Sequence, residues 1–156
     1  MAIGTNSSIW FYGTEDALDD GTTASISDNA YSTTTDVATW TNDDDAPYAS
    51  FVLTMQYPSG TIDAGGISLF ATLLNNNSTT DEPATADTWQ GHYIGRFATG
   101  TGMAATTNYA LELGPVELPN KKSSQEYQFY FKNECNVTIS ANWQLDVTPM
   151  AYGPHA

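Results

Sequence analysis

Hydrophobic and polar residues alternate along most of this chain, which is typical of β-strands that bury one face. In the segment 50–57, Phe51, Leu53 and Met55 fall on one face, opposite polar residues. Thr, Tyr, Phe, Val and Ile are frequent in such segments, and no stretch has helical periodicity. The pattern predicts strands at 9–12, 36–40, 50–57, 67–73, 92–98, 109–113, 125–132 and 139–147.

For the predicted strand 92–98, alternation also predicts which residues share a face. Simple alternation over 92–98 places Tyr93 and Phe97 on one side and Arg96 on the other. Pro and Gly clusters such as Pro58-Ser59-Gly60 separate the strands as turns.

This order of strands predicts an all-β fold. About eight strands joined by several long loops favour a single-domain β-sandwich over residues 1–156. Jelly-roll connections suit the long crossings better than an up-and-down barrel does. The polar ends, 1–8 and 149–156, are expected to be extended arms that leave the sandwich and contact a partner.

The charge of the chain restricts its partners. Among 156 residues there are 18 acidic and 4 basic ones, giving a formal net charge of −14. Binding to nucleic acid or to an anionic membrane needs clustered cations, so neither is expected as a partner. All 4 basic residues lie at or after Arg96, so the last third is expected to supply any electrostatic contact with an acidic partner.

The cysteine content and the N-terminus also narrow the possibilities. The single cysteine, Cys135, excludes an intrachain disulfide and a Cys-based zinc site. The first residues show neither a basic nor an apolar signal region, and no apolar run reaches the ~20 residues of a membrane span. We therefore expect synthesis and retention in a cytoplasm.

Residues suited to catalysis are few, and we expect a protein without enzymatic activity or cofactor. The two histidines, His92 and His155, belong to no nucleophile or metalloprotease motif. Asp43, Asp44 and Asp45 are weak candidates for Ca²⁺, since consecutive aspartates lack the spacing of a calcium loop. We expect them to be solvated turn carboxylates, and no metal site is predicted.

Four tryptophans raise the alternative of a carbohydrate-binding β-sandwich. Trp143 alternates with core positions and is expected to be buried, whereas Trp10 and Trp89 are expected nearer the surface. Exposed rings would allow stacking on sugars, but aromatic residues are also enriched in protein interfaces.

Three segments of the sequence resemble small virion structural proteins of tailed bacteriophages. They are 36–47, 122–130 and 147–156. The resemblance as a whole, which also includes 1–12, covers most of the chain in order. The resemblance is to capsid decoration or cement proteins, and it implies a β-sandwich or jelly-roll module that ties neighbouring subunits of an assembled shell together. A head-completion or tail-associated virion protein of the same fold is the alternative.

The resemblance also implies partners and a location. The partner would be the major capsid protein, on the outer surface of a head assembled in the bacterial host cytoplasm. Self-association is expected as a trimer, with a dimer as the other form.

The interface residues are predicted from charge and position. Arg96, Lys121 and Lys122 are chosen as charge partners because positive charge is scarce in this chain. Further predicted contacts with the capsid or between subunits are aromatic residues or lie near the two ends: Ile3, Trp10, Trp89, Tyr152 and His155.

Overall fold

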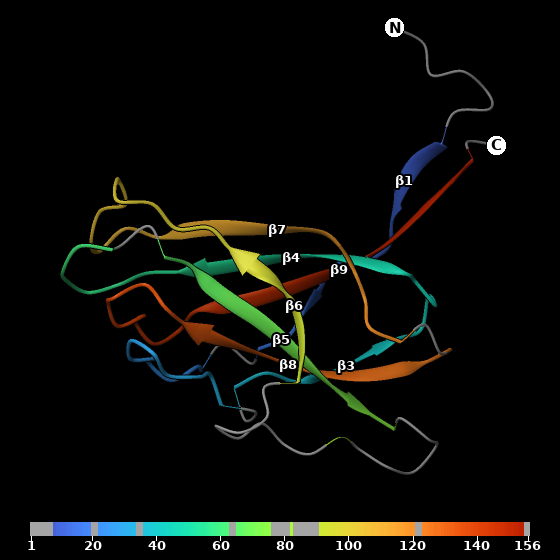
Figure 1. Ribbon diagram of the computed structural model, residues 1–156, viewed down its shortest axis with the longest axis horizontal. Coiled ribbons are helices and arrows are strands. Elements are labelled where there is room, and N and C mark those ends of the chain that lie inside the picture. The colour runs from blue at the N-terminus through green and yellow to red at the C-terminus, as the bar shows by residue number, and fades with distance from the viewer. Residues whose placement is uncertain are drawn as a thin grey trace, which may run out of the picture.

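A computed structural model describes residues 8–19, 22–33, 36–62, 65–75, 82, 91–120 and 123–154. The regular elements of these residues are all strands (Figure 1). They are β1 (Ser8–Tyr12), β2 (Asp16–Ala17), β3 (Thr39–Asn42), β4 (Tyr48–Met55), β5 (Ile67–Leu74), β6 (His92–Phe97), β7 (Tyr109–Glu117), β8 (Gln125–Asn133) and β9 (Gln144–Pro154).

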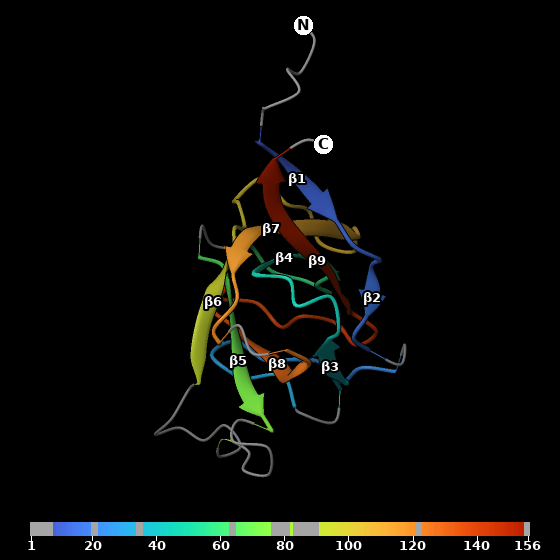
Figure 2. The same cartoon turned by 90° about the vertical axis from the view of Figure 1, so that its right-hand side faces the viewer.

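The strands form two antiparallel sheets whose order defines a jelly roll. One sheet has the order β1-β9-β4-β7, with β2 also paired to β9, and the other has the order β3-β8-β5-β6. Because β1 and β2 pair with successive parts of β9, they fill one strand position between them. The chain then crosses between the sheets in the paired Greek-key pattern of a jelly roll (Figure 2). The predicted fold class is confirmed.

The core lies between the inner faces of the two sheets, as alternation predicted. Phe51, Leu53 and Met55 of β4 are buried, and so are the alternating aromatic residues of β8. Trp143 is buried as predicted, with its ring edge-on to Phe131. Other buried residues of the cluster include Ile67, Leu69, Ala71, Phe97, Tyr127, Phe129, Leu145 and Val147.

The predicted strands differ from the observed ones in their bounds, and one of them also differs in its faces. In β6 an irregularity at the β5 pairing shifts the register, so Tyr93 lies opposite Phe70 while Phe97 lies opposite Ile67. The prediction that Tyr93 and Phe97 share a face was therefore wrong, since Tyr93 is exposed and Phe97 is buried. The largest differences in bounds are in β3, which is Thr39–Asn42 instead of 36–40, in β7, which continues to Glu117 instead of 113, and in β9, which is Gln144–Pro154 instead of 139–147.

Of the two ends that were predicted as arms, the structure describes only Ser8 and residues 149–154. Residues 1–7, 155 and 156 lie outside the described residues. Pro149–Pro154 complete β9, and Ser8 begins β1, so the described part of the C-terminal segment is paired with β1. In both views this paired end of β9 extends beyond the rest of the sandwich (Figures 1 and 2).

Candidate functional site

The projecting end of the first sheet is a two-stranded ribbon. Its strands are Ser8–Phe11 of β1 and Ala151–Pro154 of β9, and we call it the terminal ribbon. The neighbouring strand β4 begins at Tyr48, opposite Met150, so β9 has a partner on only one side beyond that point. The ribbon contains no charged residue in a chain whose formal net charge is −14.

Aromatic side chains gather on the outer face of the ribbon and beside it. Trp10 lies opposite Tyr152, and its ring packs against Tyr152 at 5.0 Å and edge-on to Tyr48 at 5.2 Å between centroids. Tyr12 is 67% exposed and Tyr152 is 55% exposed. On the other face of the ribbon, Phe11 is 46% exposed. Clustered exposed aromatic rings of this kind are typical of protein contact surfaces.

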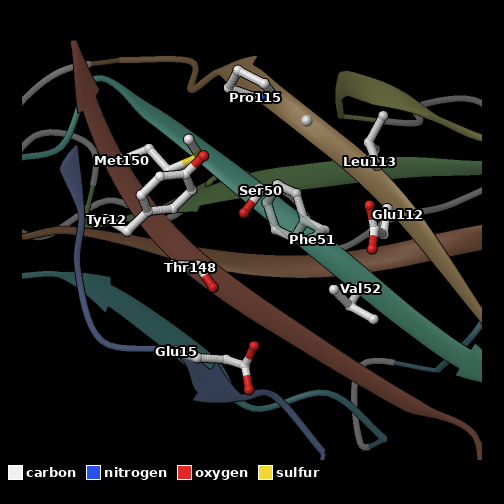
Figure 3. A pocket seen from close by; sticks show the side chains of 11 residues that line it. Tyr12, Glu15, Ser50, Phe51, Val52, Glu112, Leu113, Pro115, Thr148 and Met150 are labelled. Atoms are coloured by element: carbon white, nitrogen blue, oxygen red, sulfur yellow. The ribbon is translucent and has the colours of Figure 1, made fainter. Parts of the chain in front are cut away.

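A shallow depression continues from this aromatic group across the outer face of the sheet. It has a volume of about 330 Å³, and we call it the acidic depression. Figure 3 shows Glu15 on one side and Glu112 on the other, with β9 and β4 between them. Its lining residues are Tyr12, Glu15, Ser50, Phe51, Val52, Glu112, Leu113, Gly114, Pro115, Thr148 and Met150.

Strand register explains why these distant residues meet. Val52 lies opposite both Glu112 of β7 and Asp146 of β9, and the three side chains share the outer face. The next row toward the ribbon holds Ser50 and Thr148, which also lie opposite each other. The floor of the depression is therefore partly apolar and partly hydroxylic, with carboxylates at its sides.

A β-bulge forms one wall of the depression. The β4–β7 register shifts between Ala49 and Phe51, because β7 contributes the additional residue around Gly114. Gly114 has φ of +137°, and a Cβ there would lie 2.7 Å from the Cα of Ser50. Only glycine fits this position without a shift of backbone, and the bulge turns Pro115 toward the depression.

The acidic groups of this face repel one another. Among the described residues, neither Glu15 nor Glu112 takes part in an ion pair. Burial raises the pKa of the Asp146 carboxyl, and the nearby charges of Glu15 and Asp19 raise this pKa further. The outer face of the first sheet thus carries negative charge that described cations do not neutralise.

The described cations lie on the other sheet and have an acidic partner there. Arg96 lies 3.5 Å and Lys132 3.2 Å from the carboxylate oxygens of Glu134. The hydroxyl of Ser68 donates to the same carboxylate at 2.8 Å, and this hydrogen bond and the two cations lower the pKa of Glu134 against the effect of burial. The guanidinium of Arg96 is already paired, although 44% of its side chain stays exposed.

The predicted interface residues are only partly described. Ile3, Trp89, Lys121, Lys122 and His155 lie outside the described residues. Trp10 and Tyr152 come together in the terminal ribbon, whereas Arg96 lies on the opposite sheet and does not join them. Sequence reasoning missed Tyr12, Glu15 and Glu112, because strand pairing alone brings them to one face.

The histidine and aspartate candidates have structural contacts. His92 Nε2 lies 2.9 Å from a carboxylate oxygen of Glu82, whose other oxygen accepts the Leu73 N–H at 2.9 Å. In the loop between β3 and β4, Asp45 accepts a hydrogen bond from the N–H of Ser124 at 3.1 Å. Within the described ranges, no three His, Cys, Asp or Glu residues are grouped as metal ligands.

Trp10 is not a flat open platform for a sugar ring. Its side chain is only partly exposed, and two tyrosine rings pack against it. Trp40 is buried, with its indole N–H donating to Asp16 at 3.0 Å. Trp89 lies outside the described residues.

Comparisons with known proteins give no family for this chain. No family model and no curated protein matches it. A chain from a structure of infectious bursal disease virus, Gx strain, is 13% identical with a TM-score of 0.46, over 97% of this chain and 37% of that one. For the Gt strain of the same virus, identity is 13% and the TM-score 0.37, over 97% and 35%.

This chain therefore spans little more than a third of the length of those viral chains, with 37% and 35% covered. The jelly-roll assignment rests on the strand order itself. No helix among the described residues is long and apolar enough to cross a membrane.

Replacing Gly114 by alanine tests the role of the bulge. We expect Gly114→Ala to lower the free energy of unfolding by about 1–3 kcal/mol, because the added Cβ meets backbone and the positive φ becomes strained. Gly100→Ala is the matched control, since nothing lies within 4 Å of its added Cβ. Urea unfolding measures both, and equal stabilities of the two variants would contradict the assignment.

Replacing Asp146 by asparagine tests the charge repulsion on the outer face. At pH 7 we expect Asp146→Asn to be more stable than the wild type, by less than about 1 kcal/mol because the site is partly solvated. The pKa of Asp146 is raised by folding, so the wild type loses stability as pH rises through that folded-state pKa. The advantage of the variant should therefore disappear below about pH 3.9, the usual aspartate pKa.

Urea unfolding at several pH values and salt concentrations measures this difference. Added salt should shrink it at pH 7, because salt screens exposed charges. A variant less stable than the wild type at pH 7 would contradict the predicted repulsion.

Proposed function

We propose that this chain is a non-enzymatic structural protein of a tailed-bacteriophage virion, of the capsid decoration or cement type. It binds the outer surface of the assembled head and bridges neighbouring subunits of the major capsid protein. The resemblance of segments 36–47, 122–130 and 147–156 to such proteins supports this role, and the jelly-roll fold is compatible with it.

The terminal ribbon is the observation that carries the proposal. It combines a projecting position, no charge, and exposed aromatic side chains at Phe11 and Tyr152, with exposed Tyr12 directly beside it. Large aromatic rings are unfavourable when exposed to water in a free protein. When an interface buries them, they make the largest contributions to the binding energy. We therefore assign the shell contact to the ribbon and to the outer face of the first sheet.

The strand β1 offers a second kind of contact. It is the edge of its sheet, in the order β1-β9-β4-β7, and the segment Ser8–Tyr12 has neither charge nor proline to protect that edge. An extended segment of a shell subunit can add to such an edge through backbone hydrogen bonds.

The high negative charge suits a protein whose copies must stay separate in solution before they bind to the shell. Self-repulsion at a net charge of −14 keeps free copies apart in solution. Binding to the mature shell then stabilises that shell by linkage, since a ligand that binds one state lowers the free energy of that state. We propose trimers at local threefold positions of the shell, where contacts with the shell subunits outweigh the repulsion between copies and repetition strengthens modest single contacts.

The copy number of the chain in purified virions tests the proposed role. Quantitative mass spectrometry against the major capsid protein should give a nearly stoichiometric ratio for a protein that covers the lattice. A few copies per particle would instead indicate a head-completion or tail-associated protein. No copies would exclude a virion role and favour the carbohydrate-binding alternative.

Truncation of the exposed tyrosines tests the assigned surface. We expect Tyr12→Ser with Tyr152→Ser to weaken binding to shells roughly tenfold or more, because interface aromatics dominate binding energies. Tyr93→Ser is the control, since Tyr93 is 60% exposed on the opposite sheet. Binding is measured by co-sedimentation with shells that lack the protein. If the Tyr93 variant alone binds weakly, the assigned face is wrong.

A further inference from the structure

The acidic depression would form part of the proposed contact with the shell, so its assigned role rests on the proposed function. We infer that the depression receives an arginine or lysine side chain of the shell protein, with the cation between Glu15 and Glu112 and the stem of the side chain on the apolar floor. The exposed aromatic rings next to the depression would be buried by the same partner surface.

The shape and lining of the depression suit a long cationic side chain. Its volume of about 330 Å³ is open to the outer face, and its two glutamates come from opposite sides of it (Figure 3). Val52 and Pro115 supply apolar surface for a methylene stem, and Ser50 and Thr148 supply hydroxyl acceptors. Lys and Arg bury their stems along apolar surface while their charged ends meet polar groups.

The charges of the surrounding face argue for a cation as the occupant. Glu15, Glu112 and Asp146 lie on this face, and no described lysine or arginine is paired with any of them. Burial is the main cause of the raised pKa of Asp146, and the charges of Glu15 and Asp19 raise this pKa further, which agrees with negative charge on this face. A basic partner residue would relieve this repulsion on binding, and such complementarity also steers association.

Among its described residues, a second copy of this chain offers no lysine or arginine that is not already paired. Both described cations, Arg96 and Lys132, already contact Glu134 on the opposite sheet. Bringing two copies together also opposes the net charge of −14 that each carries. The occupant we assign is therefore a basic residue of a different protein, the shell subunit.

The contact is tested by removing the two charges of the depression. We expect Glu15→Gln with Glu112→Gln to bind shells at least about tenfold more weakly than the wild type at low salt, and the difference to shrink at high salt. The charge-matched control is Glu126→Gln with Asp43→Asn, which neutralises two acids outside the depression. Equal urea midpoints would show that both variants are folded.

The outcomes separate this inference from the proposed function. If the wild type binds shells and the Glu15/Glu112 variant binds equally well, the inference fails while the shell-binding role stands. If the control variant is weakened as much, net charge explains the effect and the inference also fails. If the wild type sediments as an oligomer and the Glu15/Glu112 variant as a monomer, the occupant is a second copy and the assignment to the shell is overturned.

A second measurement decides the inference even when shells are not bound. The peptide acetyl-Gly-Arg-Gly-amide should cause saturable NMR shifts at the amides of Val52, Glu112 and Thr148. These shifts should be lost in the Glu15/Glu112 variant and with acetyl-Gly-Gln-Gly-amide. No shifts at these amides in the wild type would overturn the inference, whatever role the protein has.

Discussion

The pairing of β9 on both of its sides is the constraint on which the rest of the structure depends. From Gln144 to Met150 this strand lies between β4 and the β1/β2 position, and from Ala151 onward it pairs with β1 alone. Its inward residues Leu145 and Val147 join the core, which fixes the register of the whole sheet. The alternate residues then form the outer face, so one strand sets both the core and the surface to which we assign binding.

The two sheets present different chemistry to the outside. The first combines the neutral, aromatic terminal ribbon with the carboxylates of the acidic depression. The second carries Arg96 and Lys132, each engaged with Glu134, and the exposed ring of Tyr93. In the free protein, the exposed aromatic rings face water and the carboxylates repel one another, and both effects are unfavourable. A complementary partner would bury the rings and neutralise the charges, which is why we assign the shell contact to the first sheet.

Sequence alternation predicted the core well, because burial of one strand face requires every second residue to be apolar. Phe51, Leu53 and Met55 are buried as expected. Alternation failed where a register shift interrupts it, as at Tyr93, since such irregularities depend on the neighbouring strand. The acidic depression was not predictable from sequence, because Glu15, Glu112 and Thr148 meet only through the pairings of β2, β4, β7 and β9. Arg96 was chosen as an interface residue because cations are scarce in this chain, and this choice stays a prediction. In the structure its guanidinium is already paired with Glu134.

Hydrogen–deuterium exchange of the protein bound to shells, compared with the free protein, tests the central claim most directly. That claim is that the outer face of the sheet β1-β9-β4-β7 meets the shell. It predicts slower exchange at the two edge strands of this sheet, β1 (Ser8–Tyr12) and β7 (Tyr109–Glu117), whose outward amides have no strand neighbour beyond them. Slower exchange confined to β6 (His92–Phe97), at the edge of the other sheet, would contradict it.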